Sequence, residues 1–405
     1  MYITRFLENY ILRVSEAFPA LIVTGPRQVG KTTMLRRLAG DGRKYVTLDD
    51  PLVREAAERD PGGFVGRYSP PVIIDEIQYA PGILPYIKMY IDERGRKGDF
   101  WLAGSQAFHM MKNVSESLAG RLAVVWMLGL SQAELEGAAG APFVCDREVF
   151  SRRLAERRPL GVGEVYERIF TGSFPAAYSG EPFMREAFYG SYVNTYLQRD
   201  MRDLAQVGDE LTFLRFITAC AARTSQMVNY ADLAKDVGIS APTAKQWLSI
   251  LVSSGMVELI QPYFTNTLKR AIKAPNMYFT DTGLCAYLTR WDSAGTLEVS
   301  AMAGAFFETY VVAEILKSYH NAGRRPPVYY YRDTDGREVE LLLEANGVLF
   351  PIEIKKTASP KRGDIRHFAA LSPGGKPVGA GCLISMYRDV IPLGENAWTA
   401  PVWVV

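Results

Sequence analysis

A glycine-rich segment near the N-terminus has the residue types and spacing of a phosphate-binding loop. In the stretch ALIVTGPRQVGKTT, Gly25 is followed by Gly30, Lys31 and Thr32 in the pattern G-x-x-x-x-G-K-T. Glycines let backbone N–H groups wrap around phosphates, and the N-terminus of the following helix favours their negative charge. Lys31 is predicted to reach the β- and γ-phosphates of ATP, and the Thr32 hydroxyl to bind Mg²⁺. The loop residues predicted to bind the nucleotide are Gly25, Pro26, Arg27, Gln28, Val29, Gly30, Lys31, Thr32 and Thr33.

Two adjacent acids supply the second half of this predicted site. The segment PPVIIDEIQ places Asp75 and Glu76 at the end of an apolar run over residues 72–74. Open α/β sheets bind their ligands at the carboxyl ends of strands. Asp75 is therefore predicted to hold Mg²⁺ through water, and Glu76 to act as general base toward the attacking water. An apolar run that ends in Asp-Glu is more often structural when it stands alone, and the upstream glycine-rich loop favours the catalytic interpretation.

Four further polar residues have two open interpretations each. Ser105 and Gln106 follow the apolar segment 99–104. They either sense the γ-phosphate of the bound nucleotide or form a turn. The first interpretation makes them nucleotide-binding candidates. Arg121, in SESLAGRLAVV, is either an arginine finger that reaches the nucleotide of a neighbouring subunit or a surface arginine that caps a helix. Arg27 either touches phosphate or faces solvent.

A hairpin near the C-terminus holds a second group of chemically capable residues. In REVELLLEANGVLFPIEIKKT, a two-residue turn at Asn346-Gly347 would place Glu340 directly opposite Glu353, with Lys355 on the same face. Cross-strand Cβ atoms lie about 4.5–5.5 Å apart, so two carboxylates there repel each other. Two facing acids beside a lysine suit a hydrolytic Mg²⁺ site, in which the acids hold the ion and the lysine steadies charge or orients water. All three are therefore predicted catalytic residues.

The surroundings of this hairpin offer a further ligand and a plainer alternative. Glu308, in the amphipathic segment GAFFETYVVAEIL, is predicted to add a metal-binding carboxylate. The same register also pairs Glu338 with Lys355 as a surface ion pair worth about 0–1 kcal/mol. That pair leaves the repulsion between the two facing acids unexplained. The basic segment 355–362 either binds a phosphate backbone or is a solvated loop.

The elements that must position the first site form an α/β domain over residues 1–135. A helix is expected over residues 31–38, directly after the glycine-rich loop. The expected strands of one sheet cover residues 20–24, 44–48, 72–74, 99–104 and 122–128.

A helical lid or linker is expected over residues 136–208. The segment 186–204 carries aromatic residues at helical spacing, which is typical of core packing. Arg199 and Asp200 at its end either form an ion pair, the favoured interpretation, or contact the ATP-binding domain.

Residues 209–295 have the order of a winged helix-turn-helix. Asn229 and Ser240 are predicted to cap its second and third helices. The predicted helices cover residues 211–226, 229–238 and 239–255. If the module binds DNA, its third helix turns Thr243, Lys245 and Gln246 toward the groove, and Lys269, Arg270 and Lys273 mark the tip of the wing. The alternative is a lid or a protein-docking module.

Composition limits the remaining classes of function. The 405 residues are 48% hydrophobic and 22% charged with a net charge of +2, which is normal for a multidomain globular protein and not for a polycation. Four scattered cysteines and three histidines, taken as structural, argue against a disulfide framework and against a zinc site. No membrane span and no signal peptide are expected, so the predicted location is the cytoplasm.

The motifs TGPRQVGKTT, VIIDEIQ, LAGSQ and SLAGR together resemble the AAA+-type P-loop ATPases of bacteria and archaea of the AAA_14 kind. The resemblance implies ATP hydrolysis by a sheet with an additional strand and a catalytic glutamate. It also implies a C-terminal domain, residues 296–405, of the PD-(D/E)XK nuclease fold. The order Glu308, Glu340, Glu353-x-Lys355 resembles that fold, with glutamate at position 340 where the fold normally has aspartate.

Three functions follow as expectations. The leading one is an ATPase whose nuclease-like domain binds and cleaves DNA with Mg²⁺ or Mn²⁺. The alternatives are an ATP-driven regulatory switch with a catalytically inactive nuclease-like domain and a protein-remodelling ATPase. The expected partners are ATP, DNA and further copies of the chain in a homo-oligomer.

Overall fold

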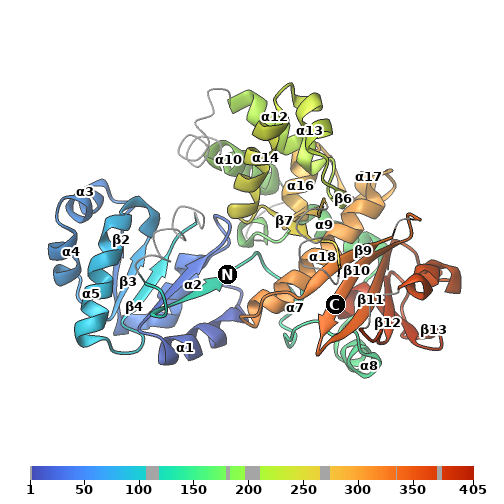
Figure 1. Ribbon diagram of the computed structural model, residues 1–405, viewed down its shortest axis with the longest axis horizontal. Coiled ribbons are helices and arrows are strands. Elements are labelled where there is room, and N and C mark those ends of the chain that lie inside the picture. Colours follow the sequence, from blue (N-terminus) through green and yellow to red (C-terminus); the bar gives the residue numbers. More distant parts are fainter. Residues whose placement is uncertain are drawn as a thin grey trace. The chain divides into compact units, whose positions relative to one another are not determined.

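The computed structural model describes residues 2–105, 118–178, 183–196, 210–264, 274–333, 335–371 and 376–405. The chain divides into two compact units (Figure 1). The first unit holds residues 1–130 with the short segments 253–255 and 320–324, and the second holds the remainder.

The first unit contains a five-stranded parallel sheet with the strand order β2-β3-β4-β1-β5. Its strands are β1 (Ala20–Thr24), β2 (Lys44–Thr47), β3 (Val72–Asp75), β4 (Phe100–Ala103) and β5 (Leu122–Trp126). Every residue of β1, β3 and β4 is buried, as expected for parallel strands covered on both faces. The five predicted strands are confirmed, and β4 is the additional strand, between β1 and β3.

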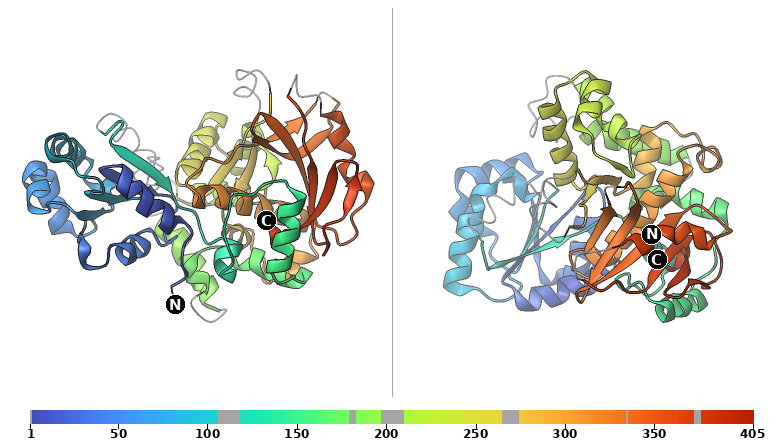
Figure 2. Two further views of the ribbon diagram at one scale, coloured as in Figure 1. Left: turned by 90° about the horizontal axis from the view of Figure 1, so that it is seen from below. Right: turned by 45° about the vertical axis from the view of Figure 1, so that its right-hand side comes forward.

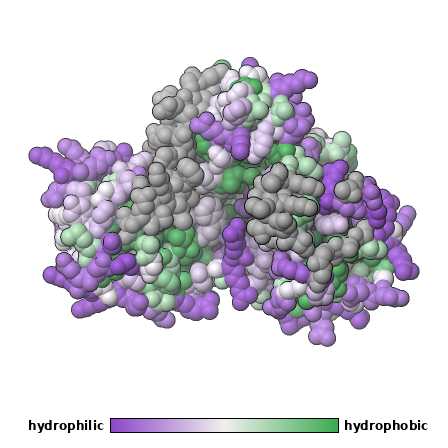
Figure 3. All heavy atoms as spheres, viewed as in Figure 1, coloured by the Kyte–Doolittle hydropathy of each residue, from purple (hydrophilic) through white to green (hydrophobic). Residues whose placement is uncertain are grey.

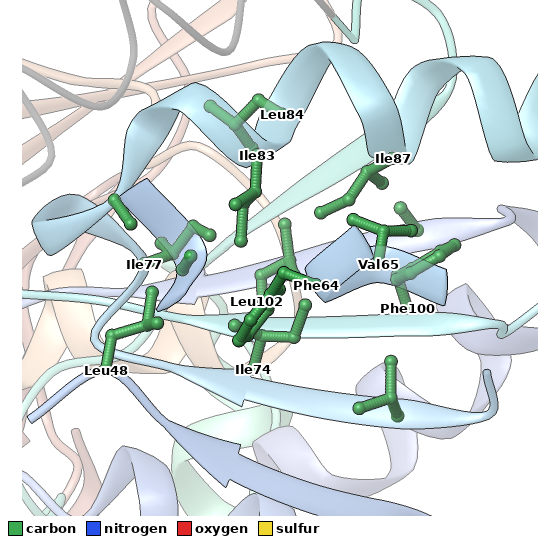
Figure 4. Packing of buried hydrophobic residues seen from close by; sticks show 14 of the residues in the cluster. Leu48, Phe64, Val65, Ile74, Ile77, Ile83, Leu84, Ile87, Phe100 and Leu102 are labelled. Atoms are coloured by element: carbon green, nitrogen blue, oxygen red, sulfur yellow. The ribbon is translucent and has the colours of Figure 1, made fainter. Parts of the chain in front are cut away.

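Helices pack this sheet into a core. They are α1 (Leu7–Ala17), α2 (Lys31–Ala39), α3 (Pro51–Arg59), α4 (Pro61–Arg67) and α5 (Leu84–Arg94). Figure 4 shows Ile74 of β3 and Leu102 of β4 in one apolar cluster. Leu84 and Ile87 of α5 belong to the same cluster, as does Ile83, which directly precedes α5. This apolar packing fixes the strands whose carboxyl ends carry the predicted site.

The second unit begins with helices and a small antiparallel sheet. The helices are α7 (Gln132–Glu136), α8 (Arg147–Glu156), α9 (Val162–Thr171), α10 (Phe183–Tyr196), α12 (Glu210–Ala221), α13 (Tyr230–Val237), α14 (Ala241–Ser253), α16 (Thr282–Leu288), α17 (Ala294–Glu298) and α18 (Ala303–Asn321). Strands β6 (Gln226–Met227), β7 (Val257–Ile260) and β8 (Asn276–Phe279) form the sheet in the order β6-β8-β7.

The predicted caps of two of these helices are confirmed. The Asn229 side chain accepts hydrogen bonds from the first turn of α13, and the Ser240 hydroxyl accepts one from Thr243 N at 3.2 Å. Arg199 and Asp200 lie outside the described residues, as do Lys269, Arg270 and Lys273 of the predicted wing tip.

A six-stranded sheet completes the second unit, drawn in orange to red in Figure 2. Its strands are β9 (Val328–Arg332), β10 (Glu338–Ala345), β11 (Val348–Lys355), β12 (Gly381–Ser385), β13 (Pro392–Gly394) and β14 (Ala397–Pro401). The sheet order is β13-β14-β12-β11-β10-β9. Strands β9, β10 and β11 are antiparallel neighbours, whereas β12 runs parallel to β11 and follows the 3₁₀ segment Arg362–Ala370.

Within the described residues, no helix has the length and apolar content needed to cross a membrane. The face drawn in Figure 3 carries many hydrophilic side chains.

Candidate functional site

The glycine-rich loop connects β1 to α2 in a conformation that requires glycine at two positions. Gly25 has a φ of 137° and Gly30 a φ of 94°, both in the region that side chains disfavour. A Cβ at Gly25 would also lie 2.0 Å from the carbonyl oxygen of Met127, which follows β5. The loop shape thus follows from glycine at both ends of the motif.

Lys31 lies inside this loop. Its side chain is buried, and Nζ donates hydrogen bonds to the carbonyl oxygens of Gly25 at 3.0 Å and Pro26 at 2.6 Å. The ammonium group therefore sits within the turn of backbone that is predicted to surround the phosphates.

The two predicted Mg²⁺ ligands are in direct contact. Thr32 Oγ1 donates to Asp75 Oδ2 at 2.8 Å, although the two residues follow β1 and end β3. Tyr45 of β2 donates its hydroxyl to the same oxygen at 3.0 Å, and Glu76 N donates to Asp75 Oδ1 at 3.1 Å. Burial and the Asp75 charge raise the pKa of Tyr45 to about 12, so its hydroxyl keeps its proton at neutral pH.

Glu76 lies beside the loop with a raised pKa. It has a φ of 55°, and Gln78 Nε2 donates to its Oε2. Burial raises the pKa of the Glu76 carboxyl, the Gln78 hydrogen bond and the charge of Arg27 lower it, the Asp75 charge raises it, and Lys31 lowers it. A carboxylate whose proton affinity is raised suits a general base, and Arg27 proves close enough to act on it.

The remaining predicted residues of the first unit do not all lie at the glycine-rich loop. Ser105 follows β4 between β1 and β3, and its buried Oγ has no hydrogen-bond partner among the described residues. Gln106 lies outside the described residues. Arg121 precedes β5 at the amino end of the sheet, where Ala20 pairs with Leu122, so it lies at the end opposite the glycine-rich loop. Its guanidinium pairs with Asp92 of α5, and the role toward a neighbouring subunit stays a prediction.

The register of the C-terminal hairpin is the predicted one. Leu341 pairs with Ile352, and Ala345 pairs with Val348 across the turn. Asn346 and Gly347 have φ values of 51° and 76°, as a two-residue hairpin turn of type I′ requires. Glu340 and Glu353 therefore face each other.

The facing carboxylates have unequal surroundings. Glu340 Oε2 accepts a hydrogen bond from Ile354 N, and Glu353 Oε1 lies 2.7 Å from Lys355 Nζ. Glu353 is only 6% exposed, and its buried Oε2 has no hydrogen-bond partner among the described residues. Lys355 thus pairs with Glu353 rather than with Glu338, which instead lies 3.9 Å from Arg332.

Glu308 of α18 joins this pair electrostatically. Its Oε1 accepts from Tyr278 OH at 2.7 Å and its Oε2 from Ser225 Oγ at 2.8 Å. Burial raises the pKa of Glu308 to about 7, with further increases from the charges of Glu338 and Glu353. We call Glu308, Glu340 and Glu353 the acid cluster.

The other two members of the acid cluster also have raised pKa values. Burial, then Glu308 and Glu353, raise the pKa of Glu340 well above its ordinary value. Burial also raises the pKa of Glu353, while Lys355 and the charge of His367 lower it. Across the described part of the chain, no group of three or more His, Cys, Asp or Glu side chains has a geometry that could hold a metal ion.

The predicted groove-facing residues of α14 are partly accessible. Lys245 and Gln246 are exposed, and Thr243 is half-buried. Ala244, Trp247 and Leu248 are buried, so the helix turns a polar face away from its core.

Four contacting residues were missed by the sequence analysis: Tyr45, Gln78, Ser225 and Tyr278. Only Gln78 had a local signal, because it stands two positions after Glu76 in the quoted motif. The other three lie in segments that no motif covers.

Comparisons with known proteins agree with the first site. Residues 17–136 match the family model described as an AAA domain. Residues 163–295 and 303–404 each match a model for a domain of unknown function. Uncharacterized proteins of Mycobacterium bovis and Mycobacterium tuberculosis are each 29% identical over 345 residues, which is 84% of this chain and 71% of each relative.

Two solved structures are more distantly similar. A Walker-type ATPase of Pyrococcus abyssi has a TM-score of 0.42 and 13% identity, and the match covers 70% of this chain and 94% of that one. A single-substitution variant of RuvB from Thermotoga maritima has a TM-score of 0.31 and 15% identity, and the match covers 62% of this chain and 88% of that one.

The AAA domain match coincides with the sheet and loop that bring Lys31, Thr32, Asp75 and Glu76 together. Such a domain implies ATP and typically Mg²⁺, for which the hydroxyl of Thr32 and the carboxylate of Asp75 are oxygen ligands of the preferred kind. The chain carries an AAA-type P-loop ATPase domain, and the protein is an ATPase.

Replacing Lys31 tests the phosphate-binding assignment. Lys31→Ala removes the cation inside the loop and should lower ATP turnover by at least roughly 100-fold, measured as phosphate release. Lys44→Ala is the matched control, because Lys44 is exposed at the start of β2 and its Nζ bonds Ser69 Oγ at 3.1 Å. Undiminished turnover in Lys31→Ala would overturn the assignment.

Replacing Glu340 tests the electrostatic strain of the acid cluster. A carboxyl whose pKa is higher in the folded than in the unfolded chain costs stability as pH rises above the unfolded value, about 4.3. Glu340→Gln cannot ionise and keeps an acceptor for Ile354 N. It should therefore raise the melting temperature at pH 8 and change it much less at pH 4.5, measured by calorimetry. An unchanged or lower melting temperature at pH 8 would contradict the strain, and exposed Glu395→Gln is the control.

Proposed function

We propose that this ATPase carries a divalent-cation-dependent phosphodiesterase site at the acid cluster and that DNA is its substrate. The observation that carries the proposal is the buried Oε2 of Glu353, which lacks a hydrogen-bond partner among the described residues while its Oε1 contacts Lys355. A buried carboxylate oxygen without a donor is costly, and a cation beside it would remove that cost.

The donor chemistry of the acid cluster supports a divalent cation as its ligand. Carboxylate oxygens are the ligands that Mg²⁺ and Mn²⁺ prefer, and the mutual repulsion of the acid cluster would be relieved by positive charge. Glu340 and Glu353 would hold the ion, with Glu308 as the third carboxylate. When bound, such an ion supplies charge stabilisation at a phosphate and an activated water.

The chain's own groups supply the remaining chemistry. Lys355, at the end of β11, is placed to pair with a phosphate oxygen or to orient the attacking water, because its Nζ already lies at the Glu353 carboxylate. Glu353 in turn holds that ammonium group in place. This division of roles is the one expected for Glu-x-Lys on one strand face.

The order of elements also supports the proposal. Helix α18, the antiparallel strands β9, β10 and β11, a 3₁₀ segment and the parallel strand β12 follow one another. Glu308 lies on the helix, Glu340 on the second strand and Glu353 on the third, which is the arrangement expected of a PD-(D/E)XK nuclease fold. Glutamate at position 340 is the departure from that fold's usual aspartate.

A DNA-binding role for residues 209–295 is part of the same proposal. The order α12, β6, α13, α14, β7 and β8 supports a winged helix, and Lys245 and Gln246 are exposed on its third helix. Ser225 and Tyr278 belong to this module and hold both oxygens of Glu308. The module that would contact DNA is therefore hydrogen-bonded to the acid cluster.

One observation favours the second candidate, an ATP-driven switch with a catalytically inactive nuclease-like domain. Both Glu308 oxygens already accept hydrogen bonds, which leaves two carboxylates rather than three for a cation. DNA cleavage and cation binding separate the two candidates.

DNA cleavage tests the leading proposal. Purified protein is incubated with supercoiled plasmid and with single-stranded DNA in Mg²⁺ or Mn²⁺, with and without ATP. Cleavage is expected in the wild type and should fall by at least roughly 100-fold in Glu353→Gln and in Lys355→Ala. Glu344→Gln is the matched control, since Glu344 lies on the same hairpin but pairs with Lys376, outside the hairpin, and is not a member of the acid cluster.

Absence of cleavage in the wild type beside robust ATP turnover would overturn the nuclease and favour the switch. Cleavage that persists in Glu353→Gln would show that the acid cluster does not catalyse it.

Cation binding gives a second, independent test. Calorimetric titration with Mn²⁺, without nucleotide, should show binding that Glu353→Gln loses and Glu344→Gln keeps. Because burial raises the pKa values of Glu308 and Glu340, protons compete with the ion near neutrality, and affinity should rise by roughly tenfold from pH 6 to pH 8. Affinity independent of pH over this range would show that neither Glu308 nor Glu340, whose pKa values are both raised, is a ligand.

A further inference from the structure

The Asp75 carboxylate is held by a tyrosine that belongs to none of the sequence motifs. Tyr45 OH donates to Asp75 Oδ2 at 3.0 Å, and Thr32 Oγ1 donates to the same oxygen at 2.8 Å. The other carboxylate oxygen, Oδ1, accepts from Glu76 N at 3.1 Å. Three donors from three segments thus fix the orientation of one carboxylate.

The sheet places Tyr45 where it can do this. In the parallel pair β2–β3, Tyr45 is the partner of Ile73, and Thr47 is the partner of Asp75. Alternate residues of a strand share a face, so Tyr45 and Asp75 project from the same face of the sheet, two positions apart along the strands.

The ring of Tyr45 is itself held in place. The guanidinium carbon of Arg36 lies 4.7 Å from the ring centroid, within the range of a cation–π contact. Arg36 stands one turn after Thr32 on α2, and Thr32, Arg36 and Tyr45 line one hollow beside the helix. Helix α2 therefore carries one predicted Mg²⁺ ligand, Thr32, and through Arg36 it also contacts Tyr45, which orients the other predicted ligand, Asp75.

We propose that Tyr45 is a positioning residue of the ATPase, which sets the Asp75 carboxylate in the orientation that holds the Mg²⁺ of bound ATP. Tyr45 acts through Asp75 and does not touch the nucleotide. Groups that hydrogen-bond a metal-binding carboxylate typically change metal affinity by about 10–100-fold when removed. A phenol suits the role because its rigid ring carries the hydroxyl across the gap between neighbouring strands.

Tyr45→Phe is the first test, because it keeps the ring and its contact with Arg36 and removes only the hydroxyl. The Mg²⁺ concentration that gives half-maximal ATP turnover should rise roughly tenfold, and excess Mg²⁺ should recover most of the lost turnover. Tyr86→Phe, an exposed tyrosine on α5, is the matched control.

A binding measurement separates positioning from a general structural role. The affinity of the protein–ADP complex for Mn²⁺, measured by calorimetry, should weaken by the same factor in Tyr45→Phe, while ADP binding without metal stays at the wild-type value. A lower maximal turnover with unchanged Mg²⁺ and Mn²⁺ dependence would overturn the proposal.

Tyr45→Leu provides the second variant, because it loses the ring as well as the hydroxyl. It should shift the metal dependence as far as Tyr45→Phe does. If only Tyr45→Leu shifts it, the ring and not the hydroxyl matters, and the proposal fails.

Discussion

The hydrogen bond between Thr32 and Asp75 depends on the order of strands in the first sheet. Thr32 comes after β1 and Asp75 ends β3, and β4 lies between those two strands. The two side chains meet because all three strands are parallel and their carboxyl ends share one edge. The segment after β5 closes on the same edge, since Met127 O lies so near Gly25 that only glycine fits. The apolar core under β3 and β4 therefore serves the site by holding this edge together.

The same edge also sets the chemistry of Glu76. Burial beside Asp75 raises the pKa of its carboxyl, whereas Gln78, Arg27 and Lys31 pull that pKa down. As a result, the Glu76 carboxyl can still ionise but binds a proton more tightly than an ordinary glutamate. The side-chain amide of Gln78, two positions further along the chain, holds it in place. The pKa of Glu76 is thus set by opposed local effects, which is the kind of environment expected of the predicted general base.

The acid cluster differs from Glu76 in this respect, because its three carboxylates lie near one another with few positive charges to lower their pKa values. Lys355 contacts Glu353, but burial and repulsion still raise the pKa values of all three members of the acid cluster. A fold selected for stability alone would gain by replacing such groups with apolar ones. Glu340 and Glu353 face each other on adjacent strands, in a register fixed by an Asn-Gly turn whose slip by one residue would turn every side chain to the other face. This costly placement is what supports the proposed cation.

The sequence by itself determined what short-range geometry controls. Gly25 and Gly30 specify the loop, Asn346-Gly347 specifies the register that sets Glu340 against Glu353, and Asn229 specifies the start of a helix. Each depends on backbone preferences or hydrogen bonds within a few residues, which a sequence pattern records directly.

Only the tertiary structure decided the partners of these groups. Tyr45 reaches Asp75 from 30 positions away, and Ser225 reaches Glu308 from 83 positions away. Arg121 is at the amino end of β5 and pairs with Asp92, which its neighbours in sequence did not indicate. Such contacts follow from which strands and helices pack side by side, and that choice is made by burial over the whole core rather than by any local segment.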